Sequence, residues 1–398
     1  MKSEFAVAGH WAGGWDEPGI IRWVEGLRAR LGSAPATLAI VFITPSFFER
    51  ASEVLEVLRV HGRLPLLVGC SSTGVIANDA EYEDAGGIAL ALYHLPGAEL
   101  HPVRFDQDSI EALETPAEWH GFTGIQPEAS RGWLVFADPF HLEGDDWLRK
   151  WNRAYPGIAT VGGLASGDWE KQRTQVYLNG EVFEEGGVAL SVCGAVALES
   201  VLSQGCTPIG ETWIITKTDR QFLVQIANRP AYAVLVDTFN ALSKEDQAKT
   251  QGNLFVGLAS TEYRDEFKRG DFVVRNLLGA DPEHGLLAIG AMARPGQTLQ
   301  FHRRDAVSAT EDLCWVLSRA RERLANRRIL GGFLCSCNGR GTRMFGKSNH
   351  DAGLIREQLG SMGLVGFYCA GELGPVGGKT FLHAYTASLG LFVADPEP

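Results

Sequence analysis

The chain has 398 residues, of which 45% are hydrophobic, and carries a formal net charge of -12. This length predicts two domains with enough apolar side chains for two cores, and the acidic balance disfavours nucleic acid or an anionic membrane as a partner. No apolar run approaches the roughly 20 residues that span a bilayer, and the first fifteen residues lack the features of a signal peptide. Seven cysteines without a regular spacing are typical of a reducing cytoplasm.

Three segments of the chain repeat one order of elements: strand, helix, strand, glycine turn and strand. They begin near residues 38, 133 and 329, and their glycine turns are expected at residues 70–74, 162–167 and 371–378. Short strands with one helix in each crossover predict the α/β class. We therefore expect two layered α/β domains with mixed sheets, built from repeated β-α-β-turn-β units.

A different pattern separates the second segment from the third. Residues 212–216 and 221–226 read as the two strands of a hairpin. Just before them, Gly205, Pro208 and Gly210 interrupt the apolar pattern. We place the domain boundary there, between residues 1–205 and 206–398.

Two glycine-rich segments near the C-terminal end each carry one ionic side chain. Residues 334–341 read LCSCNGRG and include Arg340, and residues 365–378 read VGFYCAGELGPVGG and include Glu372. Each begins as an apolar strand and ends in a turn where glycine leaves backbone N–H groups open to a ligand. Two such turns can face one small molecule.

These two segments, with PLLVGCSSTG at residues 65–74 and the stretch from 209 to 231, resemble the FIST family over nearly the whole chain. The resemblance implies an N-terminal FIST domain in residues 1–205 and a C-terminal FIST domain in 206–398. It also implies a sensory module that binds a small ligand such as an amino acid and feeds signal transduction, with a separate signalling protein as partner. No kinase, cyclase, methyl-accepting or F-box segment is recognisable, so we expect a free-standing member.

The local chemistry suggests how such a ligand would be held. The planar guanidinium of Arg340 suits a carboxylate, Glu372 suits an ammonium group, and hydroxyls nearby add donors. We expect a small anionic or zwitterionic ligand between the two domains beside Arg340. The candidate ligand-binding residues are Cys70, Ser71, Ser72, Asn338, Arg340, Gly371, Glu372, His383 and Tyr385.

Each candidate also has a structural interpretation. Arg340 can brace its loop through a salt bridge, and Glu372 can be its partner. Asn338 can be present because it tolerates a left-handed turn. His383 and Tyr385, two apart on a strand, are expected on one face, which is either a wall of the site or an ordinary half-buried sheet face.

Catalysis and metal binding are alternatives with less support. Cys70, or a hydroxyl in the same glycine-rich turn, is a weak candidate nucleophile for an amidohydrolase or transferase, and ligand lining or packing beneath the turn is the favoured interpretation of Cys70. Cys335, Cys337, Cys369 and His383 lack the usual spacing of a structural zinc site. We expect no metal and no cofactor, and the motifs of the common enzyme classes are missing from the sequence.

Overall fold

The computed structural model describes residues 5–264 and 266–395, which form two compact units. The larger unit combines the chain up to Leu202 with the chain from Leu313 onward, and the smaller unit is Ser203–Asp312. This division differs from the expected domains 1–205 and 206–398. The reason is strand pairing: β4 (Val75–Ala77) is hydrogen-bonded to β22 (Leu364–Cys369), so the C-terminal part belongs with the N-terminal part.

The larger unit contains three copies of one four-stranded motif. In each copy the last strand lies between the first and the second, and the second and third strands are parallel. The copies confirm the predicted α/β class with mixed sheets and repeated units. Their strands are β1 (Ala6–Trp11), β2 (Leu38–Ile43), β3 (Leu67–Ser71) and β6 (Ile88–Tyr93); β7 (Ala98–Phe105), β8 (Trp133–Ala137), β9 (Thr160–Leu164) and β12 (Gly187–Gly194); β13 (Val196–Ser203), β21 (Arg328–Cys337), β22 and β25 (Ala387–Ala394).

A hairpin from each copy extends the sheet of another copy. The hairpin of the first copy joins the third sheet beside β22, that of the second joins the first sheet beside β3, and that of the third joins the second sheet beside β9. This cyclic exchange interlocks the three copies. The hairpins are β4 with β5 (Ala80–Tyr82), β10 (Val176–Leu178) with β11 (Glu181–Phe183), and β23 (Gly371–Val376) with β24 (Lys379–His383).

The glycine after the valine in each third strand is required by close packing. A Cβ at Gly69 or Gly162 would lie 1.8 Å from a carbonyl oxygen of the neighbouring parallel strand, and a Cβ at Gly366 would lie 2.5 Å from one. Only glycine fits at such distances. The matching turns are therefore residues 69–74, 162–167 and 366–371. The expected third turn at 371–378 instead forms the β23–β24 hairpin.

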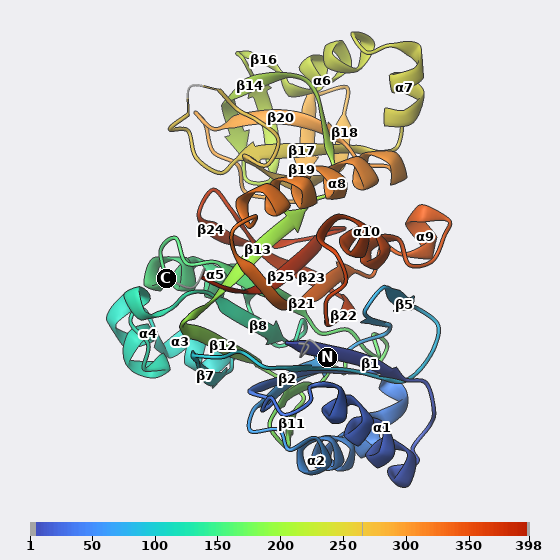
Figure 1. Cartoon of the computed structure of the whole chain (residues 1–398). Coiled ribbons are helices and arrows are strands. Elements are labelled where there is room, and N and C mark those ends of the chain that lie inside the picture. The colour runs from blue at the N-terminus through green and yellow to red at the C-terminus, as the bar shows by residue number, and fades with distance from the viewer. Residues whose placement is uncertain (1–4, 265, 396–398) are drawn as a thin grey trace. The chain divides into compact units, whose positions relative to one another are not determined.

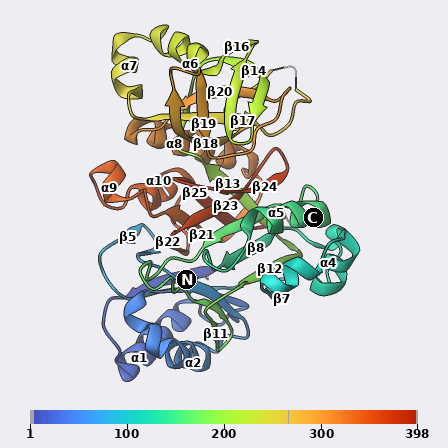
Figure 2. The same ribbon diagram turned by 180° about the vertical axis from the view of Figure 1, so that it is seen from behind.

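Helices cover the outer face of each sheet, and the inner faces form a shared core. Helices α1 (Glu17–Arg30) and α2 (Ala51–Gly62) lie side by side on the first sheet (Figures 1 and 2). In the shared core the rings of Phe42, Phe136 and Phe367 pack with centroids 4.4–5.6 Å apart. The other helices of this unit are α3 (Gln107–Ala112), α4 (Pro116–Thr123), α5 (Gly144–Ala154), α9 (Thr342–Phe345), α10 (His350–Leu359) and the 3-10 helices Pro45–Arg50 and Pro127–Ala129.

The smaller unit is an insertion between the first and second strands of the third copy. Its seven strands follow the order β14-β20-β17-β18-β19-β15-β16, and β14 also pairs with β15. That pairing confirms the predicted hairpin. None of the helices in residues 5–264 and 266–395 has the length and apolar content of a membrane span. The elements are β14 (Thr207–Asp219), β15 (Phe222–Ile226), β16 (Arg229–Pro230), α6 (Ala231–Asn240), α7 (Lys244–Thr250), β17 (Leu254–Ala259), β18 (Phe272–Asp281), β19 (Leu286–Ile289), β20 (Thr298–Arg303) and α8 (Ala306–Arg323), which continues into the larger unit.

Candidate functional site

The carboxyl ends of the three third strands meet in the larger unit. The Ser71 hydroxyl donates to the carbonyl of Ser166 at 2.9 Å, and the Ser166 hydroxyl donates to the carbonyl of Tyr368 at 2.5 Å. The Ser72 hydroxyl donates to the same Tyr368 carbonyl at 3.0 Å. The structure therefore brings the glycine turns of all three copies together.

Three candidates from the first turn are buried within this junction. Cys70, Ser71 and Ser72 have no exposed surface. Both hydroxyls donate to backbone carbonyls and so hold the turns against one another. Burial raises the pKa of the Cys70 thiol well above its usual value, and a thiol that stays protonated is a poor nucleophile.

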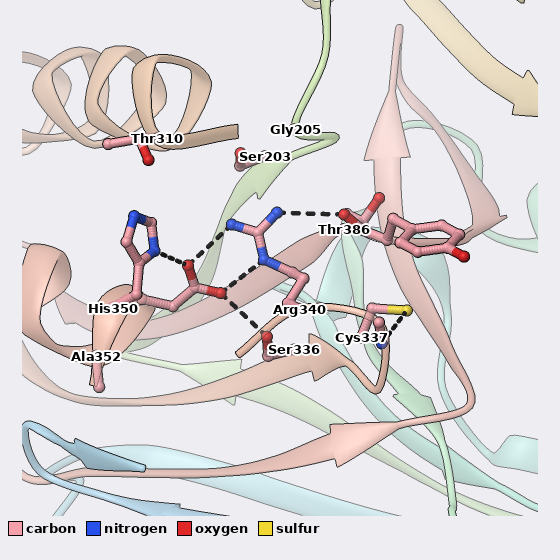
Figure 3. Close-up of polar contacts among 12 residues, drawn as sticks. Ser203, Gly205, Thr310, Ser336, Cys337, Arg340, His350, Ala352 and Thr386 are labelled. Carbon is pink, nitrogen blue, oxygen red and sulfur yellow. Dashed lines mark hydrogen bonds and ion pairs between the residues drawn. The ribbon is translucent and has the colours of Figure 1, made fainter. Parts of the chain in front are cut away.

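Arg340 is fully buried and paired with a carboxylate that the sequence did not suggest. Its Nε and Nη2 donate to the two oxygens of Asp351 at 2.7 and 2.9 Å, and its Nη1 donates to the carbonyl of Tyr385 at 3.2 Å. Arg340 lies between His350 and Thr386 (Figure 3). The contacts match the bracing interpretation of Arg340, with Asp351 rather than Glu372 as its ion-pair partner.

Asp351 is the centre of a buried polar cluster. It accepts a hydrogen bond from the Ser336 hydroxyl at 3.0 Å, and Nδ1 of His350 lies 2.8 Å from its Oδ1. Burial alone would raise the pKa of Asp351, but the charge and hydrogen bonds of Arg340, with a smaller effect of His350, hold it below its usual value. Asp351 is therefore ionised at neutral pH, and Arg340 balances its charge.

Glu372 is a second buried carboxyl, in a less polar environment. It accepts hydrogen bonds from the Cys369 thiol at 3.1 Å and from the Thr386 backbone N–H at 2.9 Å. Burial raises its pKa to about 7. The register of the three sheets places Val75 and Val176 at the equivalent positions of the other copies. Only the third copy buries an acid at this position, at a cost in stability.

Two partly exposed residues of the third copy also depart from the repeat. Asn338 stands where the other copies have proline, and its Oδ1 accepts a hydrogen bond from the exposed Thr73 hydroxyl at 3.0 Å. Tyr385 is 40% exposed, and its ring packs over Gly339, where an added Cβ would lie 2.5 Å from it. Asn338, Gly339, Tyr385 and Thr73 are called the third-copy rim below. The register makes Asn338 equivalent to Pro45 and Pro139, and Tyr385 equivalent to Gly86 and Glu185.

His383 and Tyr385 do not share a face, contrary to the expectation from their spacing. His383 is buried, with Nε2 3.0 Å from the carbonyl of Gly374, and it pairs with Glu372 in the β23–β24 ladder. Tyr385 has a positive φ of 57°, which breaks the alternation of an extended strand. Gly371 is buried at the start of β23, opposite Leu164.

The glycine-containing turn at residues 338–342, between β21 and α9, already binds a carboxylate of the chain itself. Glu83 accepts hydrogen bonds from the Thr342 backbone N–H at 2.8 and 3.0 Å and from the Thr342 hydroxyl at 2.8 Å. At Gly341, φ is 70° and an added Cβ would lie 2.4 Å from Glu83. The turn thus has the geometry for a carboxylate, as the sequence suggested, although not through Arg340.

Sequence reasoning missed Thr73, Glu83, Ser166 and Asp351. The pattern V-G, then four residues, then glycine occurs at residues 68–74, 161–167 and 365–371 and would have aligned Thr73 with Ser166. Asp351 lies in the first turn of α10, where an acidic residue reads as an ordinary helix-dipole partner. Within the described residues, no group of three or more His, Cys, Asp or Glu side chains has an arrangement that could hold a metal ion.

Burial predicts which thiols react. Cys314 is partly exposed, whereas the other six cysteines are buried. A brief treatment of the native protein with iodoacetamide is expected to modify Cys314 and to leave Cys70, Cys335, Cys337 and Cys369 unmodified, as read by peptide mass spectrometry. The same treatment in urea is the control and modifies all seven. Rapid native labelling of Cys70 would contradict its position in the core.

The chain matches two family models, curated relatives and a solved structure. The FIST N domain model matches residues 37–229 and the FIST C domain model matches residues 231–375. An uncharacterized protein of Mycobacterium bovis is 35% identical over 92% of each chain, and one of Mycobacterium tuberculosis is 34% identical over 92% of this chain and 94% of the relative. A solved structure of cyanuric acid hydrolase covers 97% of this chain and 98% of its own, at 11% identity and a TM-score of 0.35. The chain belongs to the FIST family, whose domains are sensory-type domains of signalling proteins.

Proposed function

We propose that this protein is a cytoplasmic sensor for a small zwitterionic or anionic metabolite, an amino acid or a close derivative, and that it acts through a separate signalling protein. The observation that carries the proposal is the asymmetry of the third copy. Where the other copies have valine and proline, this copy has the buried Glu372 and the partly exposed Asn338. Such departures cost stability in an otherwise repeated scaffold, and costs of this kind are characteristic of functional sites.

The ligand binds at the third-copy rim rather than on the Arg340 guanidinium. The Asn338 side-chain amide and the backbone of residues 338–342 supply donors for a carboxylate. The Glu83 carboxylate, which is bound by Thr342, is an example of such binding within the chain. The ring of Tyr385 offers a face to an ammonium group. Arg340 and Glu372 are buried and do not contact the ligand in this proposal. Arg340 holds the backbone of Tyr385 by donating to its carbonyl, and Glu372 holds the backbone of Thr386 by accepting from its N–H.

The catalytic alternative lacks comparable support. A hydroxyl or thiol nucleophile needs a base within hydrogen-bonding distance and access to substrate. The Ser71 and Ser72 hydroxyls donate to carbonyl oxygens, and both side chains are fully buried together with Cys70. We therefore assign these residues to the packing of the turns and keep binding as the function.

A ligand screen tests the proposal. Thermal shift across the common amino acids and related small acids is expected to give at least one stabilising ligand, whose affinity is then measured by calorimetry. Replacing Tyr385 by alanine should weaken that ligand about fivefold, because a cation–π contact contributes about 1 kcal/mol. Asn338→Ala should weaken it by a similar factor.

Tyr263→Ala is the matched control, since Tyr263 is 98% exposed and lies outside the larger unit. It should leave the affinity unchanged. A ligand that binds wild type, Tyr385→Ala and Asn338→Ala with equal affinity would refute the rim as the binding site. If no ligand of this class stabilises the protein, the proposed function is wrong.

A further inference from the structure

A cleft of about 500 Å³ opens at the amino ends of β21 and β22 in the larger unit. It lies among the start of β1, the last turn of α1, the turn between β4 and β5, and the loop that follows α10. Small-molecule sites in proteins commonly have volumes of roughly 300 to 1,000 Å³. The cleft therefore has room for one small organic ligand.

The lining combines apolar walls with guanidinium groups. Its apolar side chains include Phe5, Ile329, Leu330, Met362 and Leu364. The charged side chains of the lining are Arg30, Arg356 and Asp79, two cations and one anion, in a protein with a net charge of -12. Such a local reversal of sign attracts an anion.

Helix electrostatics explains part of this arrangement but not all of it. Arg30 and Arg356 lie in the last turns of α1 and α10, where cations stabilise the helix dipole. Arg356 also pairs with Asp79, and Nη1 of Arg30 donates to the carbonyl of Ala8 at 3.3 Å. A dipole effect requires only a surface position. It does not account for a cleft of ligand size, with apolar side chains in its lining, beside both side chains.

We propose that this cleft is a second binding site, for a small amphipathic anion with one carboxylate or sulfonate and an aromatic or branched aliphatic body. The acid group lies at Arg30 and Arg356, where a guanidinium can donate two parallel hydrogen bonds. The body packs on Ile329, Leu330 and Met362. The site is separate from the third-copy rim, because Leu330 and Asn338 lie eight residues apart along β21 and its turn, roughly 25 Å of extended chain.

A matched pair of fluorescent probes tests the proposal on the full-length protein. Anilinonaphthalene sulfonate carries an aromatic body and one anionic group, and phenylnaphthylamine carries a similar body without the charge. The sulfonate should bind wild type with a saturable fluorescence rise, and Arg30→Gln should weaken it about tenfold, the loss expected for a charged hydrogen bond. Phenylnaphthylamine should be unaffected by Arg30→Gln.

Two further variants separate the cleft from other surfaces. Arg28→Gln removes the same charge from the same last turn of α1 but lies outside the lining, so it should leave the sulfonate affinity unchanged. Met362→Trp fills the cleft and should weaken both probes. The proposal is overturned if the sulfonate does not bind wild type, if Arg28→Gln and Arg30→Gln weaken it equally, or if folded Arg30→Gln and Met362→Trp variants bind as wild type does.

Discussion

Replacing Arg340 by alanine is expected to lower the free energy of unfolding by about 3–5 kcal/mol. The side chain is fully buried and donates two hydrogen bonds to Asp351. Its removal leaves an ionised carboxylate inside the protein without its cation, and breaking one side of a buried ion pair has a cost of this size. Urea unfolding at neutral pH measures the loss. From the sequence alone, the same substitution would be expected to weaken a ligand and leave the fold intact.

Arg343→Ala is the matched control, because Arg343 lies three residues along in α9 and is exposed. Its effect should stay within about 0.5 kcal/mol. The loss in unfolding free energy in the double variant Arg340→Ala with Asp351→Ala should be smaller than the sum of the losses in the two single variants, because the two residues interact directly. If the loss in the double variant equals the sum of the losses in the two single variants, or if Arg340→Ala is as stable as wild type, the ion pair does not brace the turn.

Glu372 should make the protein less stable as the pH rises from about 4.5 to about 8. Its pKa is raised from 4.5 in the unfolded chain to about 7 in the folded protein. Below 4.5 both states are protonated. Between the two values only the unfolded state ionises, so the contribution of this group to stability is lost as the pH passes through the folded pKa. The loss amounts to about 3 kcal/mol.

The Glu372→Gln variant keeps the shape of the side chain and removes the titration. The difference in unfolding free energy between wild type and Glu372→Gln, measured across this pH range, should therefore change by about 3 kcal/mol in favour of the variant. Asp351 has a low pKa that affects stability at more acidic pH. Because it is present in both proteins, its contribution cancels in the difference between their unfolding free energies. Glu56→Gln on the exposed face of α2 is the control and should show no such change. If the difference between wild type and Glu372→Gln does not change with pH, Glu372 ionises in the folded core over the same pH range as in the unfolded chain, and its pKa is not raised.

The repeated order of elements was predictable because it is local. Apolar strands, one helix in each crossover and a glycine turn leave the same pattern three times, and the structure confirms the α/β class. The glycines at 69, 162 and 366 are visible in the sequence for a physical reason, since no other residue fits against the neighbouring carbonyl. Local pattern thus identified the units of the scaffold.

Partners distant in the sequence were not predictable from a single chain. The exchange of hairpins joins β4 to β22, almost three hundred residues apart, and nothing in a short strand specifies which edge it joins. For the same reason the expected boundary between residues 205 and 206 falls inside the third copy, because β13 precedes the inserted unit and β21 follows it. The pairing of Arg340 with Asp351 spans a turn and a helix start, so Arg340 looked available to a ligand in the sequence.

Hydrogen exchange read by mass spectrometry, with and without the amino acid that emerges from the ligand screen, tests the central claim most directly. Binding at the third-copy rim should slow exchange in peptides that cover residues 338–345 and 383–387, because a bound ligand stabilises the turns it touches. Peptides that cover residues 355–364, beside the separate cleft, should exchange at an unchanged rate. Protection of residues 355–364 without protection of 338–345 would contradict the account.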